Sequence, residues 1–186
     1  LGSFLFWRIK KDGQDKRFVV MKTQFVWFLM TWTLGGLWVL VTMAAGLAAM
    51  TSDTTIALGP LAYLGITLWV AGMLVEVIAD NQKTEFRKNP ENRDRFISTG
   101  LWAWSRHPNY FGEITLWFGL ALVALPVLSG WQLATMISPI FVYILLTKIS
   151  GIPLLERMAK KKWGSDPEFI AYTESTPALR LRKPQG

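Results

Sequence analysis

The sequence predicts an all-α fold: a polytopic integral membrane helix bundle with polar loops and short C-terminal helices. Of the 186 residues, 51% are hydrophobic, ten are Trp, and the apolar residues lie in long blocks. An apolar block of about 20 residues is long enough to cross the hydrocarbon core of a bilayer as a helix. All 20 Lys and Arg lie in three polar segments, which is typical of a membrane protein rather than of a soluble domain.

Four apolar blocks predict four membrane spans. The first block contains no charged residue, and the second ends beside two acids, Glu76 and Asp80. Pro139 and Pro153 are expected to kink or end helices. We expect the spans at about 23–50, 56–78, 111–128 and 131–149.

Polar segments predict two loops, at 8–22 and 80–110, and a tail at 150–186. Within the tail we expect an amphipathic helix that ends near Gly164. A second short helix follows, with Asp166 as its N-cap and Pro167 in its first position. The whole chain is expected to be a single membrane domain. Because residues 1–7 resemble the end of an apolar segment, we also expect further helices before them.

Charge fixes the expected orientation in the membrane. The two short turns around Asp53 and Ser129 contain no Lys or Arg. Since Lys and Arg accumulate in cytoplasmic loops, we expect both basic loops and the C-terminus in the cytoplasm. The net charge of +7 then reflects contact with anionic lipid, not with nucleic acid.

The chain has no Cys and one His, so a metal site is not expected. Nothing in the sequence indicates an oligomeric state.

The segment 80–112 is the main candidate site, because it holds six cations and the only His between two apolar blocks. Lys83 and Arg87 are four residues apart, so they share a face if the helix of the second span continues past the membrane boundary. Pro108 begins a helix just after Arg106 and His107. Free N–H groups at a helix start, next to cations, favour an anion. The expected ligand therefore carries phosphate or carboxylate groups.

Other polar residues leave two interpretations open. Asn109 and Tyr110 lie at the expected helix start, and Glu113 lies one turn further on. A collar of cations for lipid headgroups explains the charge more simply, but it requires neither Asn109 nor Glu113. Glu76 and Asp80, which share a face, either mark the membrane boundary or line a site.

The tail adds cations and aromatic rings. Arg157 and the run 160–162 are basic, and Trp163 and Tyr172 offer surfaces for stacking. Together with the loop they suit a large, anionic, aromatic ligand such as a nucleotide. The glycine-rich phosphate-binding motifs of soluble nucleotide-binding proteins are absent from the sequence.

Two motifs carry a family resemblance. N-Q-K-T-E-F-R-K-N-P at 81–90 and G-L-W-A-W-S-R-H-P-N-Y-F-G-E at 100–113 resemble the C-terminal signature of the membrane sterol reductases and the steroid 5α-reductase superfamily. The tail K-K-K-W-G-S-D-P-E-F-I-A-Y-T-E-S-T-P at 160–177 resembles that of its bacterial DUF1295 branch. The resemblance covers the chain from about Arg8 onward.

The resemblance implies a reductase of lipid metabolism in the bacterial inner membrane. Such an enzyme uses NADPH, bound by cytoplasmic loops, to reduce a C=C bond in a steroid-like or other lipophilic substrate. In the steroid 5α-reductases the acid and the Tyr that polarise the substrate lie upstream of the matched region. No catalytic residue is therefore assigned here.

The same resemblance implies cofactor contacts. Lys83 and Arg87 would hold phosphates, and Ile97 and Trp102 would line the adenosine half. Asn109 and Tyr110 would contact the nicotinamide half or the pyrophosphate, and Glu113 the carboxamide or ribose. The implied cofactor-binding set is Glu76, Asp80, Lys83, Arg87, Ile97, Trp102, Arg106, His107, Asn109, Tyr110, Glu113, Glu156, Lys162, Trp163 and Tyr172.

The tail departs from the sterol-reductase pattern, and a second enzyme class remains open. Glu156 replaces an Asp only approximately, and Trp163 stands where Tyr is usual. The isoprenylcysteine carboxyl methyltransferases share the R-H-P-x-Y-x-G block and would bind S-adenosylmethionine instead. Lys83 and Arg87 favour a cofactor with more phosphates. A non-enzymatic lipid-binding or assembly subunit is a third interpretation.

Overall fold

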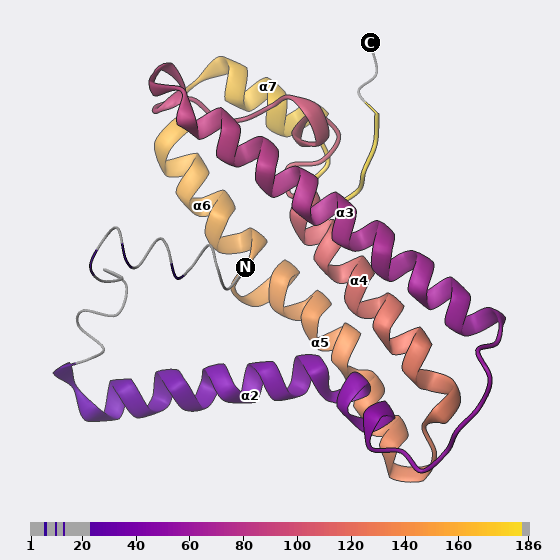
Figure 1. Ribbon diagram of the computed structural model, residues 1–186. Helices are drawn as coiled ribbons and strands as arrows, with labels where there is room; N and C mark the ends of the chain where they lie inside the picture. Colours follow the sequence, from indigo (N-terminus) through magenta and orange to yellow (C-terminus); the bar gives the residue numbers. More distant parts are fainter. Residues whose placement is uncertain (1–5, 7–9, 11–12, 14–22, 184–186) are drawn as a thin grey trace. The chain divides into compact units, whose positions relative to one another are not determined.

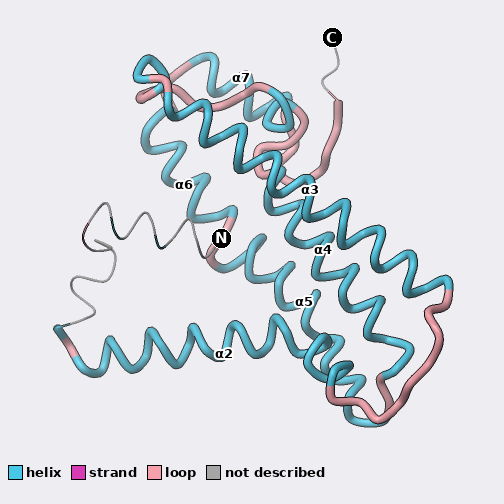
Figure 2. The backbone as a smooth tube through the Cα atoms, in the orientation of Figure 1, coloured by secondary structure: helices cyan, strands magenta, loops and turns pink. Residues whose placement is uncertain are grey.

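The computed structural model describes residues 6, 10, 13 and 23–183, and its regular structure is helical (Figures 1 and 2). No strand occurs in these described residues, so the predicted all-α class is confirmed for them. Most of the expected loop at 8–22, and all but one of residues 1–7, lie outside the described part. The helices are α2 (Phe25–Met50), α3 (Pro60–Lys88), α4 (Pro108–Ala124), α5 (Ile137–Ile144), α6 (Ile152–Trp163) and α7 (Pro167–Ser175).

Four helical stretches are long and apolar enough to cross a membrane, which makes the chain an integral membrane protein. The third stretch ends in a short 3₁₀ turn, and the fourth runs through α5 and α6. The chain divides into two units, Leu1–Leu40 and Val41–Gly186, and every contact described below lies within the second. The stretches are Phe25–Met50, Pro60–Lys88, Pro108–Val127 and Gly130–Trp163.

Helices α3 and α4 are antiparallel and cross along a line of four glycines (Figure 1). A Cβ atom added to Gly72 would lie 2.6 Å from the carbonyl oxygen of Gly112, and one added to Gly119 would lie 2.6 Å from that of Gly65. Only residues without a side chain allow two backbones to approach this closely. The crossing fixes the start of α4 beside the C-terminal half of α3.

Helix α3 extends well beyond the expected end of the second span at residue 78. Its 29 residues correspond to about 43 Å at 1.5 Å per residue, more than the hydrocarbon core requires. The helix ends where Asn89 precedes Pro90, since a residue before proline avoids the α conformation. The Asn89 side chain accepts a hydrogen bond from the backbone N–H of Glu91 (3.0 Å). The last turns of α3 therefore carry Lys83 and Arg87.

The fourth stretch changes its helical geometry between α5 and α6. A π-helical turn at Leu145–Ile149 is followed by Gly151, where a Cβ atom would overlap the carbonyl oxygen of Leu146. Pro139 and Pro153 lie in the first turns of α5 and α6. A first-turn residue needs no N–H donor, so proline fits there. The helix before Pro153 ends at Ile149, as that prediction requires, whereas the kink expected at Pro139 stays a prediction.

The tail has the predicted form. Helix α6 ends at Trp163, and the Asp166 side chain caps α7 by accepting a hydrogen bond from the backbone N–H of Glu168 (2.9 Å). After α7 the chain is extended and runs beside the segment that precedes α4. The backbone N–H of Arg182 donates to the carbonyl oxygen of Trp104 (3.0 Å).

Candidate functional site

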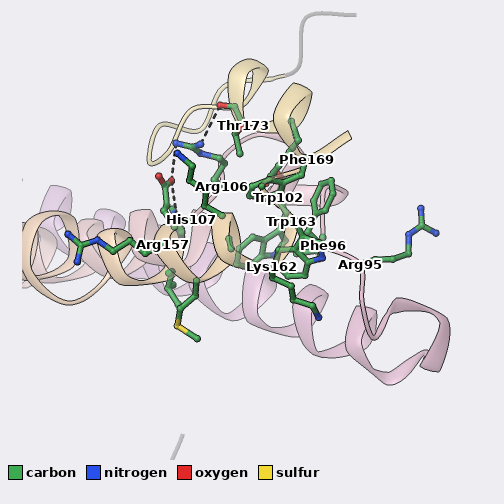
Figure 3. Close-up of a pocket in the computed structure, with 18 of the residues that line it drawn as sticks. Arg95, Phe96, Trp102, Arg106, His107, Arg157, Lys162, Trp163, Phe169 and Thr173 are labelled. Carbon is green, nitrogen blue, oxygen red and sulfur yellow. Dashed lines mark hydrogen bonds and ion pairs between the residues drawn. The ribbon is translucent and has the colours of Figure 1, made fainter. Parts of the chain in front are cut away.

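A cavity of about 770 Å³ opens among the C-terminal end of α3, the segment between α3 and α4, and helices α6 and α7 (Figure 3). Small-molecule sites have volumes of roughly 300–1,000 Å³, so the cavity suits a ligand as large as a nucleotide. Its walls come from regions that are distant in sequence. We call this cavity the basic pocket.

Seven cationic side chains line the basic pocket, against a single carboxylate, Glu156. Figure 3 shows Arg95 and Arg157 at opposite ends of the labelled group, with the aromatic residues between them. Only two of the seven pair with a carboxylate in the described part of the chain. Such a concentration of like charge attracts a ligand with several negative charges. The cations are Lys83, Arg87, Arg95, Arg106, Arg157, Lys160 and Lys162.

Aromatic side chains form one wall of the pocket around Phe96. The ring centroid of Phe96 lies 5.2 Å from that of Phe169, 5.3 Å from that of Tyr172 and 6.0 Å from that of Trp163. Aromatic clusters of this kind bind planar rings by stacking. A polycationic pocket with an aromatic wall therefore suits a nucleotide better than a phosphate group alone.

Trp102 supports the wall from within. Its side chain is buried, and its indole N–H donates to the backbone carbonyl of Ala79 on α3 (3.0 Å). The ammonium group of Lys83 lies 4.6 Å from the centre of its ring, in cation–π contact. Trp102 thus positions Lys83 at the edge of the pocket.

Three side chains of the tail hold the segment between α3 and α4 against α6 and α7. All three donate to backbone carbonyl oxygens, so they fix the path of the main chain. Burial raises the pKa of Tyr172 well above its ordinary value, which keeps its hydroxyl protonated as a donor. The bonds run from Lys162 Nζ to Arg93 (3.1 Å), from Trp163 Nε1 to Asp94 (2.6 Å) and from the Tyr172 hydroxyl to Trp102 (2.7 Å).

Arg106, His107 and Glu156 form a network at one wall (Figure 3). Glu156 Oε1 lies 2.9 Å from Arg106 Nη2 and 3.3 Å from His107 Nε2, and Arg106 Nη1 donates to the carbonyl of Thr173 (3.3 Å). Burial lowers the pKa of His107, although the hydrogen bond to Glu156 opposes the shift. The neutral form of His107 is thereby favoured at pH 7, and its hydrogen bond to the carboxylate requires the tautomer with the proton on Nε2.

A second polar group, which we call the α3–α4 cluster, lies beside the basic pocket. Asn109 Nδ2 donates to Asp80 Oδ1 (3.1 Å). The rings of His107 and Tyr110 are stacked, with centroids 5.7 Å apart, so this pair connects the cluster to the pocket wall. Glu76 faces Gly112 at the helix crossing.

The structure thus divides the implied cofactor-binding set into two groups. The first group lines the basic pocket: Lys83, Arg87, Ile97, Trp102, Arg106, His107, Glu156, Lys162, Trp163 and Tyr172. The second group belongs to α3 and α4 and does not line the pocket: Glu76, Asp80, Asn109, Tyr110 and Glu113. The roles that the resemblance implies for both groups stay predictions.

Sequence reasoning missed several lining residues. Arg95 belongs to the basic segment, so its charge was a usable signal. Phe96 and Phe169 gave no local signal, because each stands between one charged residue and an isoleucine, a context that ordinary helix or loop packing also explains. Only the packing of the segment against α6 and α7 brings the two rings together.

These features define an integral membrane protein with a positively charged pocket at the ends of its helices. The chain belongs to the family described as "Protein of unknown function (DUF1295)", whose model matches residues 1–176. The resemblance seen in the sequence is thereby confirmed at the level of the family.

Relatives in two enzyme classes are similar to parts of the chain. The 3-oxo-5-alpha-steroid 4-dehydrogenase 1 of Bos taurus is 34% identical over 70 residues, which are 38% of this chain and 27% of the relative. A probable O-methyltransferase of Ustilaginoidea virens is 29% identical over 103 residues, 55% of this chain and 36% of the relative. The chain therefore spans about a quarter to a third of these relatives. No solved structure matches it.

Proposed function

We propose that this protein is a membrane-embedded, NADPH-dependent reductase that acts on a C=C bond of a steroid-like or other lipophilic substrate. The observation that carries the proposal is the charge of the basic pocket: seven cations and one carboxylate beside an aromatic wall. NADPH bears three phosphate groups and two planar rings, and S-adenosylmethionine bears no phosphate. The similarity to the bovine steroid dehydrogenase supports the same class.

The residues present fit the cofactor. Arg87 and Lys83 on α3, with Arg95, would hold phosphate groups, because none of them is paired with a carboxylate in the described part of the chain. Phe96 and Trp163 would stack with a planar ring. When bound, NADPH supplies a hydride, and the α3–α4 cluster would face the reacting part of the complex. No residue of this chain is assigned as the proton donor.

The expected setting follows from the charge pattern. The basic pocket would face the cytoplasm, where the cofactor is available, in a bacterial inner membrane. The lipophilic substrate would enter from the bilayer. Labelling with a membrane-impermeant reagent at a cysteine introduced at the exposed position Lys88 tests this orientation: protection in intact cells is expected, and labelling contradicts it.

S-adenosylmethionine-dependent methyl transfer is the second candidate. The specific observation in its favour is the fungal O-methyltransferase, whose similarity covers more of this chain than that of the bovine enzyme. A methyltransferase would leave most of the pocket cations without a ligand charge to bind. We therefore rank it below the reductase.

Fluorescence titration separates the two candidates. Trp102 and Trp163 line the pocket, so energy transfer from Trp to bound reduced nicotinamide gives a direct signal. We expect saturable quenching by NADPH, competition by 2′,5′-ADP and no response to S-adenosylmethionine. Saturable binding of S-adenosylmethionine without NADPH binding would contradict the reductase and support the methyltransferase.

A further inference from the structure

Glu156 is the only carboxylate among the lining residues of the basic pocket. A negative charge at this position repels every anionic ligand, so the pocket would bind a plain polyanion better without it. One of its oxygens, Oε1, is used by Arg106 and His107. The other oxygen, Oε2, accepts no hydrogen bond from any described residue, and the side chain is 38% exposed. Glu156 therefore keeps a free acceptor at the pocket wall.

This carboxylate also removes positive charge from its surroundings. It pairs with Arg106 at 2.9 Å, and its second partner, His107, is uncharged at neutral pH. The part of the wall formed by these three residues is thus close to neutral, whereas Arg87, Arg95 and Lys160 pair with no carboxylate of the described residues. A ligand that matches this pattern has phosphates in one part and an uncharged hydrogen-bond donor in another.

We propose that Glu156 accepts a hydrogen bond from an uncharged donor of the bound nucleotide, either a ribose hydroxyl or an amide N–H, and thereby selects nucleotides over other polyanions. The inference rests on the proposed function and adds a specificity determinant to it. The seven cations attract any multiply charged anion, including polyphosphate and phospholipid headgroups. A carboxylate accepts strong hydrogen bonds from hydroxyl and amide donors, and polyphosphate has none to offer.

Isothermal titration of the full chain in zwitterionic nanodiscs tests this selection with two ligands, NADPH and inorganic tripolyphosphate. Glu156→Gln keeps one oxygen for Arg106 but can turn an N–H toward the ligand in place of Oε2. We expect this variant to bind NADPH roughly tenfold more weakly, the size of a lost charge-assisted hydrogen bond. We expect tripolyphosphate to bind equally or more tightly, because a repelling charge is gone.

Matched controls locate the contact. Glu174→Gln makes the same charge change at an exposed position of α7 outside the pocket, and we expect both affinities to stay as in the wild type. Titration with 2′,5′-ADP shows which half of NADPH carries the donor, because this ligand has an adenosine ribose but no nicotinamide riboside. If Glu156→Gln weakens NADPH alone, the donor lies in the nicotinamide half; if it weakens both, the donor is in the adenosine half.

Two results would overturn the proposal for Glu156. Equal tightening of NADPH and tripolyphosphate means that the carboxylate only repels anions. Loss of both ligands in a variant whose Tm equals that of the wild type means that the carboxylate only holds Arg106 in place. A wild-type protein that binds tripolyphosphate but not NADPH overturns the proposed function as well. The wild-type titrations therefore test the proposed function separately from the variants.

Discussion

Gly72 of α3 and Gly112 of α4 lie so close together that a Cβ atom on either would come 2.6 Å from the carbonyl oxygen of the other. The same Cβ atom on Gly112 would lie 3.0 Å from the Cβ atom of Glu76. This approach therefore sets the distance between the two helices at the α3–α4 cluster.

We expect Gly112→Ala to destabilise the protein by roughly 1–3 kcal/mol, the usual cost of forcing an extra carbon into a tight contact. The added methyl group must push α3 and α4 apart, because its nearest neighbours are backbone atoms. Gly36→Ala is the control, since a Cβ atom there has no described residue within 4 Å apart from its chain neighbours and the nearby backbone of its own helix. Thermal unfolding in detergent measures the stability of both variants. An unchanged Tm for Gly112→Ala would contradict the close approach of α3 and α4.

Arg87 is expected to bind phosphate, whereas its neighbour Lys88 pairs with Glu85 (2.6 Å) outside the pocket. Arg87→Gln removes one charge from the pocket, so we expect NADPH to bind at least about tenfold more weakly, as charged hydrogen bonds generally contribute. The difference from wild type should shrink as salt rises, because salt screens exposed charges. Lys88→Gln provides the control. Equal effects of the two variants would show that only net charge matters.

The hydroxyl of Tyr172 joins α7 to the segment before α4 through the Trp102 carbonyl. We expect Tyr172→Phe to lower the free energy of unfolding by about 1 kcal/mol, the typical value of one hydrogen bond, and to weaken nucleotide binding moderately. Tyr63→Phe changes an exposed Tyr of α3 whose hydroxyl makes no hydrogen bond to a described residue, and should have little effect on either. A Tyr172→Phe protein as stable as the wild type would mean that this bond does not hold the segment.

His107 gives the stability a defined pH dependence. Burial lowers its pKa in the folded protein below the ordinary value of 6.5. The unfolded chain therefore binds a proton on this residue at pH values where the folded protein does not, so stability falls as the pH drops below about 6.5. Because His107 is the only His, His107→Gln should remove this part of the loss. Tm is measured against pH for the wild type and for His107→Gln. If the two curves run parallel down to a pH of about 5, His107 is not the source of this pH dependence.

The fold was predictable where its causes are local. Uninterrupted hydropathy marks the membrane-spanning helices, and Asp166 followed by Pro167 marks the start of α7 by capping alone. The true end of α3 was harder to predict, because the helix continues into polar residues as far as Lys88. Its continuation depends on packing against Trp102 and Ile97, which lie later in the chain.

The candidate site was predictable by residue type but not by arrangement. The charge of residues 80–112 and of the tail indicated an anionic ligand, and the structure places both around one cavity. The division between the basic pocket and the α3–α4 cluster was not foreseen. It depends on which face of α4 carries Asn109, and hence on the glycine crossing, which no local pattern specifies.

The bonds that Lys162 and Trp163 make to the carbonyls of Arg93 and Asp94 have a consequence for the evolution of the family. A carbonyl oxygen is present whatever the side chain, so the residue at position 93 can diverge among relatives while the pocket rim keeps its shape. Position 94 has less freedom, because the Asp94 carboxylate also pairs with Lys162 (3.1 Å). Homologues should therefore vary more at 93 than at 94 and retain a hydrogen-bond donor at 162, 163 and 172.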